Sequence, residues 1–255
     1  MRECASWREA FDLGSSEHIA LVGGGGKTTT LWSLARELST TAPTIVTSTT
    51  KAGARPPDVA FVAYGKAVPD HTLKEAVGSA LQHARLVAVG SGAREGRLEG
   101  IAPEIADELF FRCGASYVIN EADGARMKPF KAPAAHEPVL ASTTTLMIVV
   151  VGLDAVGAII DDEHLHRAER IAELTGAAPG APMEVEHIAT IVRAYESKCK
   201  DVDESARFAV LVNKVDAGPE VPALKRLGQA LAHVELGALV AASQLGDRTM
   251  RWRLR

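Results

Sequence analysis

Four consecutive glycines, followed by a lysine and two threonines, constrain the fold of this chain more than any other segment, and they occupy Gly23–Thr29. The apolar run His18–Val22 precedes them and predicts a short strand, while Leu31, Leu34 and Leu38 follow at the spacing of a helix. A strand, a glycine turn and a helix in this order favour anion binding, because glycine tolerates positive φ angles and lets phosphate approach the backbone. The helix N-terminus adds unpaired N–H groups and the positive end of its dipole.

The residue types in this P-loop predict how it holds a nucleoside triphosphate. We expect Lys27 to supply a cation for the β and γ phosphates, and Thr28 to supply a hydroxyl for Mg²⁺. The usual spacing has a glycine six residues before the lysine, and Leu21 occupies that position, so we expect a shortened or variant loop. The predicted set for binding Mg²⁺ with ATP or GTP is Gly23, Gly24, Gly25, Gly26, Lys27, Thr28 and Thr29.

Strand-like and helix-like segments alternate along the rest of the chain. The expected strands are 44–47, 86–89, 117–120, 146–151, 208–212 and 239–242, and the expected helices are 28–39, 72–83, 103–113, 163–174, 185–196 and 222–233. The alternation favours an α/β fold of the P-loop NTPase-like type, with a mostly parallel sheet and helices on both faces. We expect a single nucleotide-binding domain over 1–255, with a small helical insertion at about 152–205.

Two carboxylates follow the expected strand 117–120, namely Glu121 and Asp123. P-loop enzymes use a carboxylate at the end of a neighbouring strand to hold Mg²⁺. We predict that Asp123 binds the metal together with Thr28, and that Glu121 is an alternative metal partner or a catalytic base. An ordinary solvated turn is the other interpretation, because turns favour Asp and Gly.

The run Asn213-Lys214-Val215-Asp216 closes another apolar strand and matches the N-K-x-D signature of GTP-binding proteins. An aspartate accepts hydrogen bonds from both the ring N–H and the exocyclic amine of guanine, and adenine offers no such pair of donors. We therefore expect Asn213, Lys214 and Asp216 to contact the nucleotide. A polar turn after the strand is the alternative, and ATP stays open.

A polar stretch stiffened by prolines, residues 121–140, lies between two apolar strands, and loops of this length are often functional. We expect Lys131, His136 and Glu137 to contact a second substrate or a partner, with His136 also a candidate catalytic group. A merely solvated loop is the alternative.

His166 and Arg167 lie on the expected helix 163–174. The planar fork of an arginine suits a substrate oxyanion or the γ-phosphate, and an exposed helix face is the plainer interpretation.

Composition excludes several classes of protein. The net charge of −4 argues against a broad nucleic-acid surface, and the longest apolar stretch, 146–160, is interrupted and too short to span a bilayer. Three cysteines without a CxxC motif suit a reducing compartment, so we expect a cytoplasmic protein. We expect the tail that carries Arg248, Arg251, Arg253 and Arg255 to be solvated.

Several motifs together resemble the YqeC-type family of selenium-dependent hydroxylase accessory proteins. The matching segments occur in family order and are Val22–Thr28, Thr49-Thr50-Lys51, Glu121-Ala122-Asp123-Gly124, Lys131–Pro138, Gly152-Leu153-Asp154, His166-Arg167 and Asn213–Asp216. Ser48 and Ala52 depart from the usual threonine-rich strand end. The resemblance implies a P-loop nucleotide-binding fold, a substrate or partner contact at Lys51, and a role in maturing molybdenum hydroxylases.

Three functions are compatible with these features. The first is an accessory protein that binds and hydrolyses a nucleoside triphosphate, with a molybdenum hydroxylase or its cofactor as partner. The second is a small-molecule kinase or an ATP-dependent ligase. The third is a GTP-dependent binding switch with little catalysis.

Overall fold

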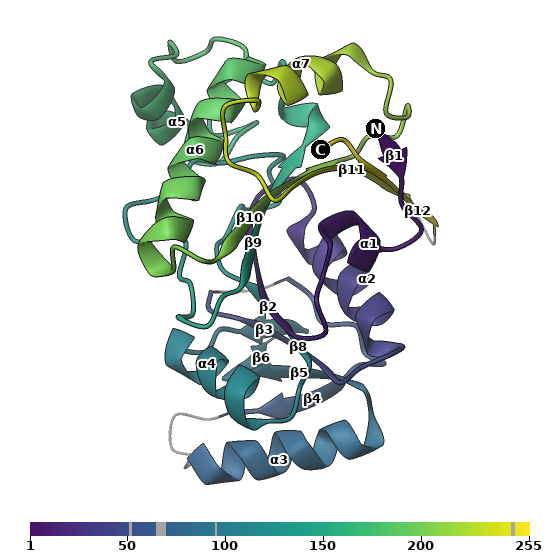
Figure 1. The fold of residues 1–255 in the computed structure, drawn as a ribbon. Coiled ribbons are helices and arrows are strands. Elements are labelled where there is room, and N and C mark those ends of the chain that lie inside the picture. The colour runs from purple at the N-terminus through teal and green to yellow at the C-terminus, as the bar shows by residue number, and fades with distance from the viewer. Residues whose placement is uncertain (51–52, 65–69, 95, 246–247) are drawn as a thin grey trace.

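A computed structural model of the chain describes residues 1–50, 53–64, 70–94, 96–245 and 248–255. Within these ranges, ten strands form one large sheet with helices on both of its faces (Figure 1). The strands are β1 (Arg2–Glu3), β2 (Glu17–Gly23), β3 (Thr44–Ser48), β4 (Ala60–Ala63), β5 (Leu86–Gly90), β6 (Gly92–Arg94), β7 (Arg97–Glu99), β8 (Tyr117–Glu121), β9 (Leu146–Gly152), β10 (Arg207–Asn213), β11 (Ala238–Leu245) and β12 (Arg248–Arg253). The helices are α1 (Trp7–Phe11), α2 (Lys27–Ser39), α3 (Asp70–His83), α4 (Pro103–Arg112), the short 3₁₀ helix η1 (Leu153–Ala155), α5 (Ala168–Thr175), α6 (Val185–Val202) and α7 (Pro222–Ala230). The expected α/β fold with a mostly parallel sheet is confirmed.

The large sheet has the strand order β1-β12-β11-β10-β9-β2-β8-β3-β5-β4, and the hairpin β6–β7 lies outside it. Strands β4 and β5, β3 and β5, β3 and β8, β2 and β8, β2 and β9, β9 and β10, and β10 and β11 all pair in parallel. Only the edge formed by β12 and β1 is antiparallel among the described strands of this sheet. Helices connect most successive parallel strands, as such pairing requires.

Both faces of the sheet are covered, because successive side chains of a strand point to opposite faces. On β2, Ile19 and Leu21 pack in the core that includes α1 and α2. Ala20 and Val22 pack in the core that includes α5, α6 and α7. Helices α3 and α4 cover the far half of the sheet over β3, β5 and β8 (Figure 1). The central strands are therefore buried on both sides, which explains their continuous apolar runs.

The carboxyl ends of the central strands bring the polar motifs to one edge of the sheet. Glu121 at the end of β8 lies opposite Leu21 of β2, and Asn213 at the end of β10 lies opposite Gly152 of β9. Gly23 ends β2 between them. Ligands of open α/β sheets bind at this edge, and the motifs of the chain meet there.

The helical insertion between β9 and β10 is present and consists of η1, α5 and α6. The expected helix 163–174 begins later, at Ala168, because Arg167 has a left-handed backbone with φ of 64°. Helix α6 is longer than expected and continues to Val202. The elements that the sequence did not predict, among them β4, β6 and β7, are short and lack a clear periodicity.

The expectation of a solvated C-terminal tail is wrong, because the tail forms strand β12 beside β11. The guanidinium of Arg251 lies 3.1 Å from a carboxylate oxygen of Glu37 and 4.6 Å from the ring centre of Trp7. Trp252 is buried on the same strand. Arginine stems cover apolar surface while their charged ends find partners, so a basic tail can still pair into a sheet.

Two further observations concern the cysteines and the apolar segments. Cys4, Cys113 and Cys199 are free thiols and all three are buried. Of the helices within the described ranges, none is long and apolar enough to cross a membrane.

Candidate functional site

The turn from β2 to α2, residues 23–29, is here called the glycine loop. Its backbone has positive φ angles at Gly23 (89°), Gly25 (73°) and Gly26 (116°). A Cβ atom on Gly25 would lie 2.2 Å from the backbone nitrogen of Gly152, so the loop passes too close to β9 for any side chain. The sequence therefore has glycine here for both conformation and space.

The glycine loop divides into two halves by the partners of its N–H groups. In the first half, the N–H of Gly24 donates to Val150 O at 2.9 Å, and that of Gly25 donates to Lys128 O at 2.9 Å. The second half contains the four backbone N–H groups of Gly26, Lys27, Thr28 and Thr29. None of them has a hydrogen-bond partner among the described residues. Gly26 also precedes α2 without a side-chain cap, so the positive end of this helix is open.

Lys27 is buried, and its ammonium group points back onto the loop. It donates to Gly23 O at 2.6 Å and lies 3.2 Å from Asp123 Oδ1 and 3.9 Å from Glu121 Oε1. The structure thus brings together Lys27, Glu121 and Asp123, three of the four predicted catalytic residues. The fourth, His136, is exposed and does not line the cleft beside the glycine loop.

Asp123 is fully buried, and both of its oxygens are occupied by protein donors. Each oxygen lies 3.1 Å from the N–H of Gly23, and Oδ2 also accepts from Tyr195 Oη at 2.8 Å. Two ammonium groups approach it, Lys27 at 3.2 Å and Lys131 at 3.3 Å. Asp123 therefore links the start of the glycine loop to Tyr195 of α6 and to Lys131.

Glu121 instead faces the open side of the loop. Its Oε2 accepts from the hydroxyl of Thr28 at 3.0 Å, and the residue lines a cleft beside the glycine loop. Burial raises the pKa of Glu121, and the opposing attraction of Lys27 is the largest effect that lowers it. Of the two carboxylates proposed for a metal, the one beside Thr28 is Glu121.

A buried chain of alternating charges runs from Asp123 to the start of α5. The ammonium of Lys131 contacts Asp123, donates to Gly124 O at 2.8 Å and also donates to Glu137. The guanidinium of Arg167 then binds Glu137 through both of its terminal nitrogens, one of them at 2.8 Å. Burial would raise the pKa of Glu137, but hydrogen bonds from Arg167 and Lys131 outweigh it and lower the pKa to about 2. Lys131 is thus a direct partner of Asp123, and Glu137 and Arg167 are linked to Asp123 through Lys131.

His166 lies next to this chain, and its ring makes no hydrogen bond within the described residues. Its pKa is lowered to about 4, first by burial and then by the positive charges of Arg167, Lys131 and Arg126. The predicted contact at Lys51 falls outside the described residues.

The N-K-x-D segment meets the glycine loop through Asn213, whose amide donates to Gly25 O at 2.9 Å. The side-chain amide of Gln244 on β11 donates to Oδ1 of Asn213 at 3.0 Å. Lys214 has a left-handed backbone, and its ammonium lies 2.5 Å from Asp154. Asp216 is exposed and accepts from the hydroxyl of Ser243 at 2.7 Å. This segment therefore ends in one carboxylate whose orientation is fixed.

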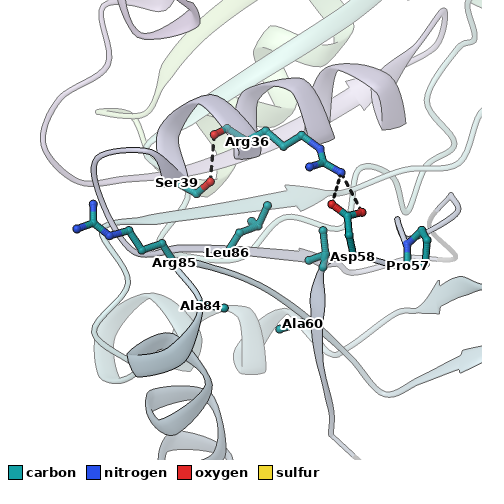
Figure 2. Close-up of a pocket in the computed structure, with 9 residues that line it drawn as sticks. Arg36, Ser39, Pro57, Asp58, Ala60, Ala84, Arg85 and Leu86 are labelled. Carbon is teal, nitrogen blue, oxygen red and sulfur yellow. Dashed lines mark hydrogen bonds and ion pairs between the residues drawn. The ribbon is translucent and has the colours of Figure 1, made fainter. Parts of the chain in front are cut away.

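A cleft of about 500 Å³ opens beside the glycine loop. Its walls are formed by the loop, by the segment after Asp123 and by single residues of other elements: Gly24–Thr29, Gly53, Arg97, Glu121, Gly124–Lys128 and Lys214. A larger hollow of about 580 Å³ lies away from these motifs, between α2 and the starts of β4 and β5 (Figure 2). Its arginines are already engaged, since Arg36 binds Asp58 at 2.9 and 3.1 Å and Arg85 donates to Thr40 O. The smaller cleft is therefore the candidate site, because it is lined by the glycine loop, including Lys27 and Thr28, and by Glu121.

Among the described residues, no group of three or more His, Cys, Asp or Glu side chains is arranged to hold a metal by itself. A magnesium ion bound with a nucleotide needs fewer protein ligands, because phosphate oxygens and waters complete its coordination. The oxygens of Thr28 and Glu121 fit such an ion.

Several residues of this site were missed or barely indicated by the sequence. Tyr195 lies on the apolar face of an amphipathic helix, and nothing in that pattern distinguishes it from a core residue. Arg97 stands in a segment without a motif, Arg126 lies in the polar stretch 121–140 without being singled out there, and Gln244 belongs to an ordinary strand end. Ser243 ends the run Ala241-Ala242-Ser243, which is weakly similar in sequence to a loop on the guanine side of GTP-binding proteins.

The fold and the site together define a class: an α/β protein with a glycine loop between strand and helix at the carboxyl edge of its sheet. A family model described as YqeC protein matches residues 19–169, more than half of the sequence, and the chain belongs to this family. The Escherichia coli (strain K12) protein called "Uncharacterized protein YqeC" is 28% identical over 235 residues, which cover 90% of this chain and 89% of that protein. No solved structure matches the chain.

Proposed function

We propose that this protein binds a nucleoside triphosphate with Mg²⁺ at the glycine loop. The observation that carries the proposal is the set of four consecutive N–H groups at the start of α2, from Gly26 to Thr29, that have no partner among the described residues. The first four N–H groups of an α-helix have no partners within the helix, and here no side chain caps them and the residues that carry them line a cleft, which favours a ligand with several acceptor oxygens. A polyphosphate provides such oxygens, and the cleft beside the loop has the volume of a small-ligand site.

The side chains around these N–H groups support the same ligand. Lys27 contacts Gly23 O and the carboxylates of Asp123 and Glu121, and a short rotation of its flexible stem would direct the ammonium to a phosphate. Thr28 and Glu121 would hold the magnesium ion, which neutralises charge on the phosphoryl oxygens. We assign Asp123 a different role, since its oxygens already fix Gly23 and Lys27 in place.

We also propose that the nucleotide is hydrolysed. Lys27 would stabilise the negative charge that develops on the phosphoryl group, and Glu121 is the carboxylate nearest to the open cleft that can orient a water molecule. Release of phosphate without any added acceptor distinguishes hydrolysis from a kinase or a ligase, which would require one.

The base favoured by this geometry is guanine. Asn213 ties the N-K-x-D segment to Gly25, so the segment lies at the same edge as the proposed phosphate site. The hydroxyl of Ser243 fixes one oxygen of Asp216 at 2.7 Å and leaves the carboxylate exposed. A fixed and exposed carboxylate on this segment suits the two N–H donors of guanine.

The binding experiment compares nucleotide affinity in the wild-type protein, Lys27→Ala and Lys225→Ala. Lys225 is an exposed lysine of α7 and serves as the matched control. We expect Lys27→Ala to weaken GTP binding by about tenfold or more, the effect of one charge-assisted hydrogen bond, and Lys225→Ala to change nothing. A thermal melt identifies a misfolded variant, and Thr28→Val then tests the site separately through the loss of Mg²⁺ dependence. Equal affinity in all variants would refute the proposal.

For the biological role, we propose that the protein assists the maturation of selenium-dependent molybdenum hydroxylases, which is what the family resemblance implies. The test is to purify such a hydroxylase from cells with and without this protein, and to measure its molybdenum and selenium content. Unchanged contents in the two preparations would refute this role and leave the nucleotide proposal intact.

A further inference from the structure

Besides the glycine loop, the lining of the cleft includes two arginines, Arg97 and Arg126. The backbone of Arg97 pairs with Ala54, and the neighbouring Gly53 abuts Thr28: a Cβ on Gly53 would lie 2.5 Å from the Thr28 hydroxyl. Arg97 is therefore located on the Thr28 side of the cleft, where the last phosphate of a bound nucleotide would end.

Arg126 lines the cleft from a different segment, which is tied to the glycine loop. Lys128 O accepts from the N–H of Gly25, and the N–H of Lys128 donates to Ala125 O, both at 2.9 Å. Between these ties, Arg126 and Met127 both have left-handed backbones, with φ of 48° and 62°. Two consecutive non-glycine residues in this conformation are uncommon and cost energy, and such strain is found mainly at functional sites.

The cleft carries more positive charge than a nucleotide requires. The cations among its described lining residues are Lys27, Arg97, Arg126, Lys128 and Lys214, and the carboxylate among them is Glu121. Three of these cations have protein partners, because Lys27 contacts Asp123, Lys214 contacts Asp154, and Lys128 donates to a backbone carbonyl.

The other two cations, Arg97 and Arg126, are exposed, and their guanidinium groups make no hydrogen bond or ion pair with any described residue. A guanidinium carries five N–H donors in a planar fork that matches a phosphate or a carboxylate. Both groups therefore remain available after the N–H groups of the glycine loop have bound a nucleotide.

The pKa of His166 is lowered in part by nearby positive charges, including that of Arg126. This pKa is about 4, because burial and the charges of Arg167, Lys131 and Arg126 outweigh the attraction of Glu137. The ring is therefore neutral at pH 7. An anion bound at Arg126 would offset part of this field and raise the pKa of His166.

We propose that Arg97 and Arg126 bind the oxyanion group, a phosphate or a carboxylate, of a second substrate while the glycine loop holds the nucleotide. This inference rests on the proposed function, since a nucleotide bound at the glycine loop would leave Arg97 and Arg126 free to bind another anion. The second substrate is thus a small anion that lies beside the terminal phosphate.

The experiment uses inorganic phosphate as the probe. The protein is first saturated with Mg²⁺ and a non-hydrolysable GTP analogue, so that the γ-phosphate position is filled, and phosphate is then titrated by calorimetry. We expect weak but saturable binding, and a loss of about tenfold or more in affinity for Arg97→Ala and for Arg126→Ala. Arg94→Ala is the matched control, because Arg94 is exposed on the same hairpin and does not line the cleft. In parallel, NMR titration of the His166 ring should show a higher pKa when phosphate is present.

The outcomes separate this inference from the proposed function. If the GTP analogue does not bind, both proposals fail. If the analogue binds but phosphate does not, or if the Arg97→Ala and Arg126→Ala variants bind phosphate as the wild type does, only the second-substrate site is refuted. Phosphate binding to the GDP-loaded protein alone assigns the anion to the γ-phosphate position and also refutes the second site.

Discussion

The phenolic hydroxyl of Tyr195 lies 2.8 Å from Oδ2 of Asp123, and this contact joins the middle of α6 to the first glycine of the glycine loop. Asp123 holds the N–H of Gly23 at 3.1 Å, and the ammonium of Lys27 lies 3.2 Å away. The helical insertion is therefore part of the support of the site, since it supplies one of the donors that fix its central carboxylate.

Replacing Tyr195 by Phe tests this support. The change removes one donor from a buried, charged acceptor and preserves the ring, so we expect a loss of about 1–3 kcal/mol in the free energy of unfolding. We also expect weaker nucleotide binding, because Asp123 then holds Gly23 and Lys27 less firmly. Urea denaturation and nucleotide titration measure the two effects.

The matched control is Tyr117→Phe, in which the lost acceptor is the neutral carbonyl of Gly14 at 2.7 Å. We expect about 0.5–1.5 kcal/mol for this loss and no change in nucleotide affinity. If the two variants bind nucleotide equally well, Tyr195 has no role beyond packing.

Glu137 should make stability depend on pH in the acid range. Its pKa is about 2 in the folded protein against 4.5 as the ordinary value, because hydrogen bonds from Arg167 and Lys131 outweigh burial. A lowered carboxyl pKa contributes stability that is present above about pH 4.5 and is lost as the pH falls towards 2. The shift corresponds to about 3 kcal/mol at neutral pH.

Glu137→Gln should therefore be less stable than the wild type at pH 7, and this difference should shrink as the pH is lowered towards 3. Denaturation curves at a series of pH values measure it. Glu169→Gln, an exposed glutamate on α5, is the control and should follow the wild type throughout. A stability difference for Glu137→Gln that does not change with pH would contradict the assigned pKa.

The sequence predicted the parts of this site that depend on local pattern. The strand before Gly23 and the helix after Gly26 follow from periodicity, and the turn between them follows from glycine chemistry. The carboxyl ends of parallel strands then predict that the polar motifs meet at one edge.

The roles of individual side chains depend on contacts that no local pattern records. Glu121 and Asp123 are two residues apart, yet Thr28 contacts the first and Tyr195 the second. Tyr195 is 72 residues away from Asp123 and reads as one apolar position of α6. That the side chains of Arg97 and Arg126 have no partner among the described residues likewise becomes apparent only in the structure.

Close packing of the glycine loop against β9 predicts a large cost for a single methyl group. Gly25→Ala would place a Cβ 2.2 Å from Gly152 N at a φ of 73°. Gly157→Ala is the matched control, because Gly157 also has a positive φ, 83°, but has open space around it. We expect about 1–2 kcal/mol for the control, the cost of a left-handed backbone, and roughly 1–3 kcal/mol more for Gly25→Ala. Urea denaturation decides this, and equal losses would show that the loop can move away from β9.

The exposed carboxylate of Asp216 predicts an exchange of base preference. Guanine presents two donors, a ring N–H and an amine, whereas xanthine keeps the ring N–H and has a carbonyl in place of the amine. Asp216→Asn replaces one acceptor oxygen by a donor NH₂, so we expect weaker GTP binding, stronger XTP binding and unchanged ATP binding. The loss for GTP should be about tenfold or more, since it removes a hydrogen bond to a charged group.

Ser243→Ala is the companion variant, because it frees the Asp216 carboxylate without changing its chemistry. We expect it to weaken GTP binding less than Asp216→Asn does and to leave the order GTP before XTP intact. A panel of fluorescent nucleotide analogues measures all three bases on the same preparation. If the wild-type protein binds GTP and ATP equally, Asp216 does not contact the base, and the N-K-x-D segment acts only through the bond from Asn213 to Gly25.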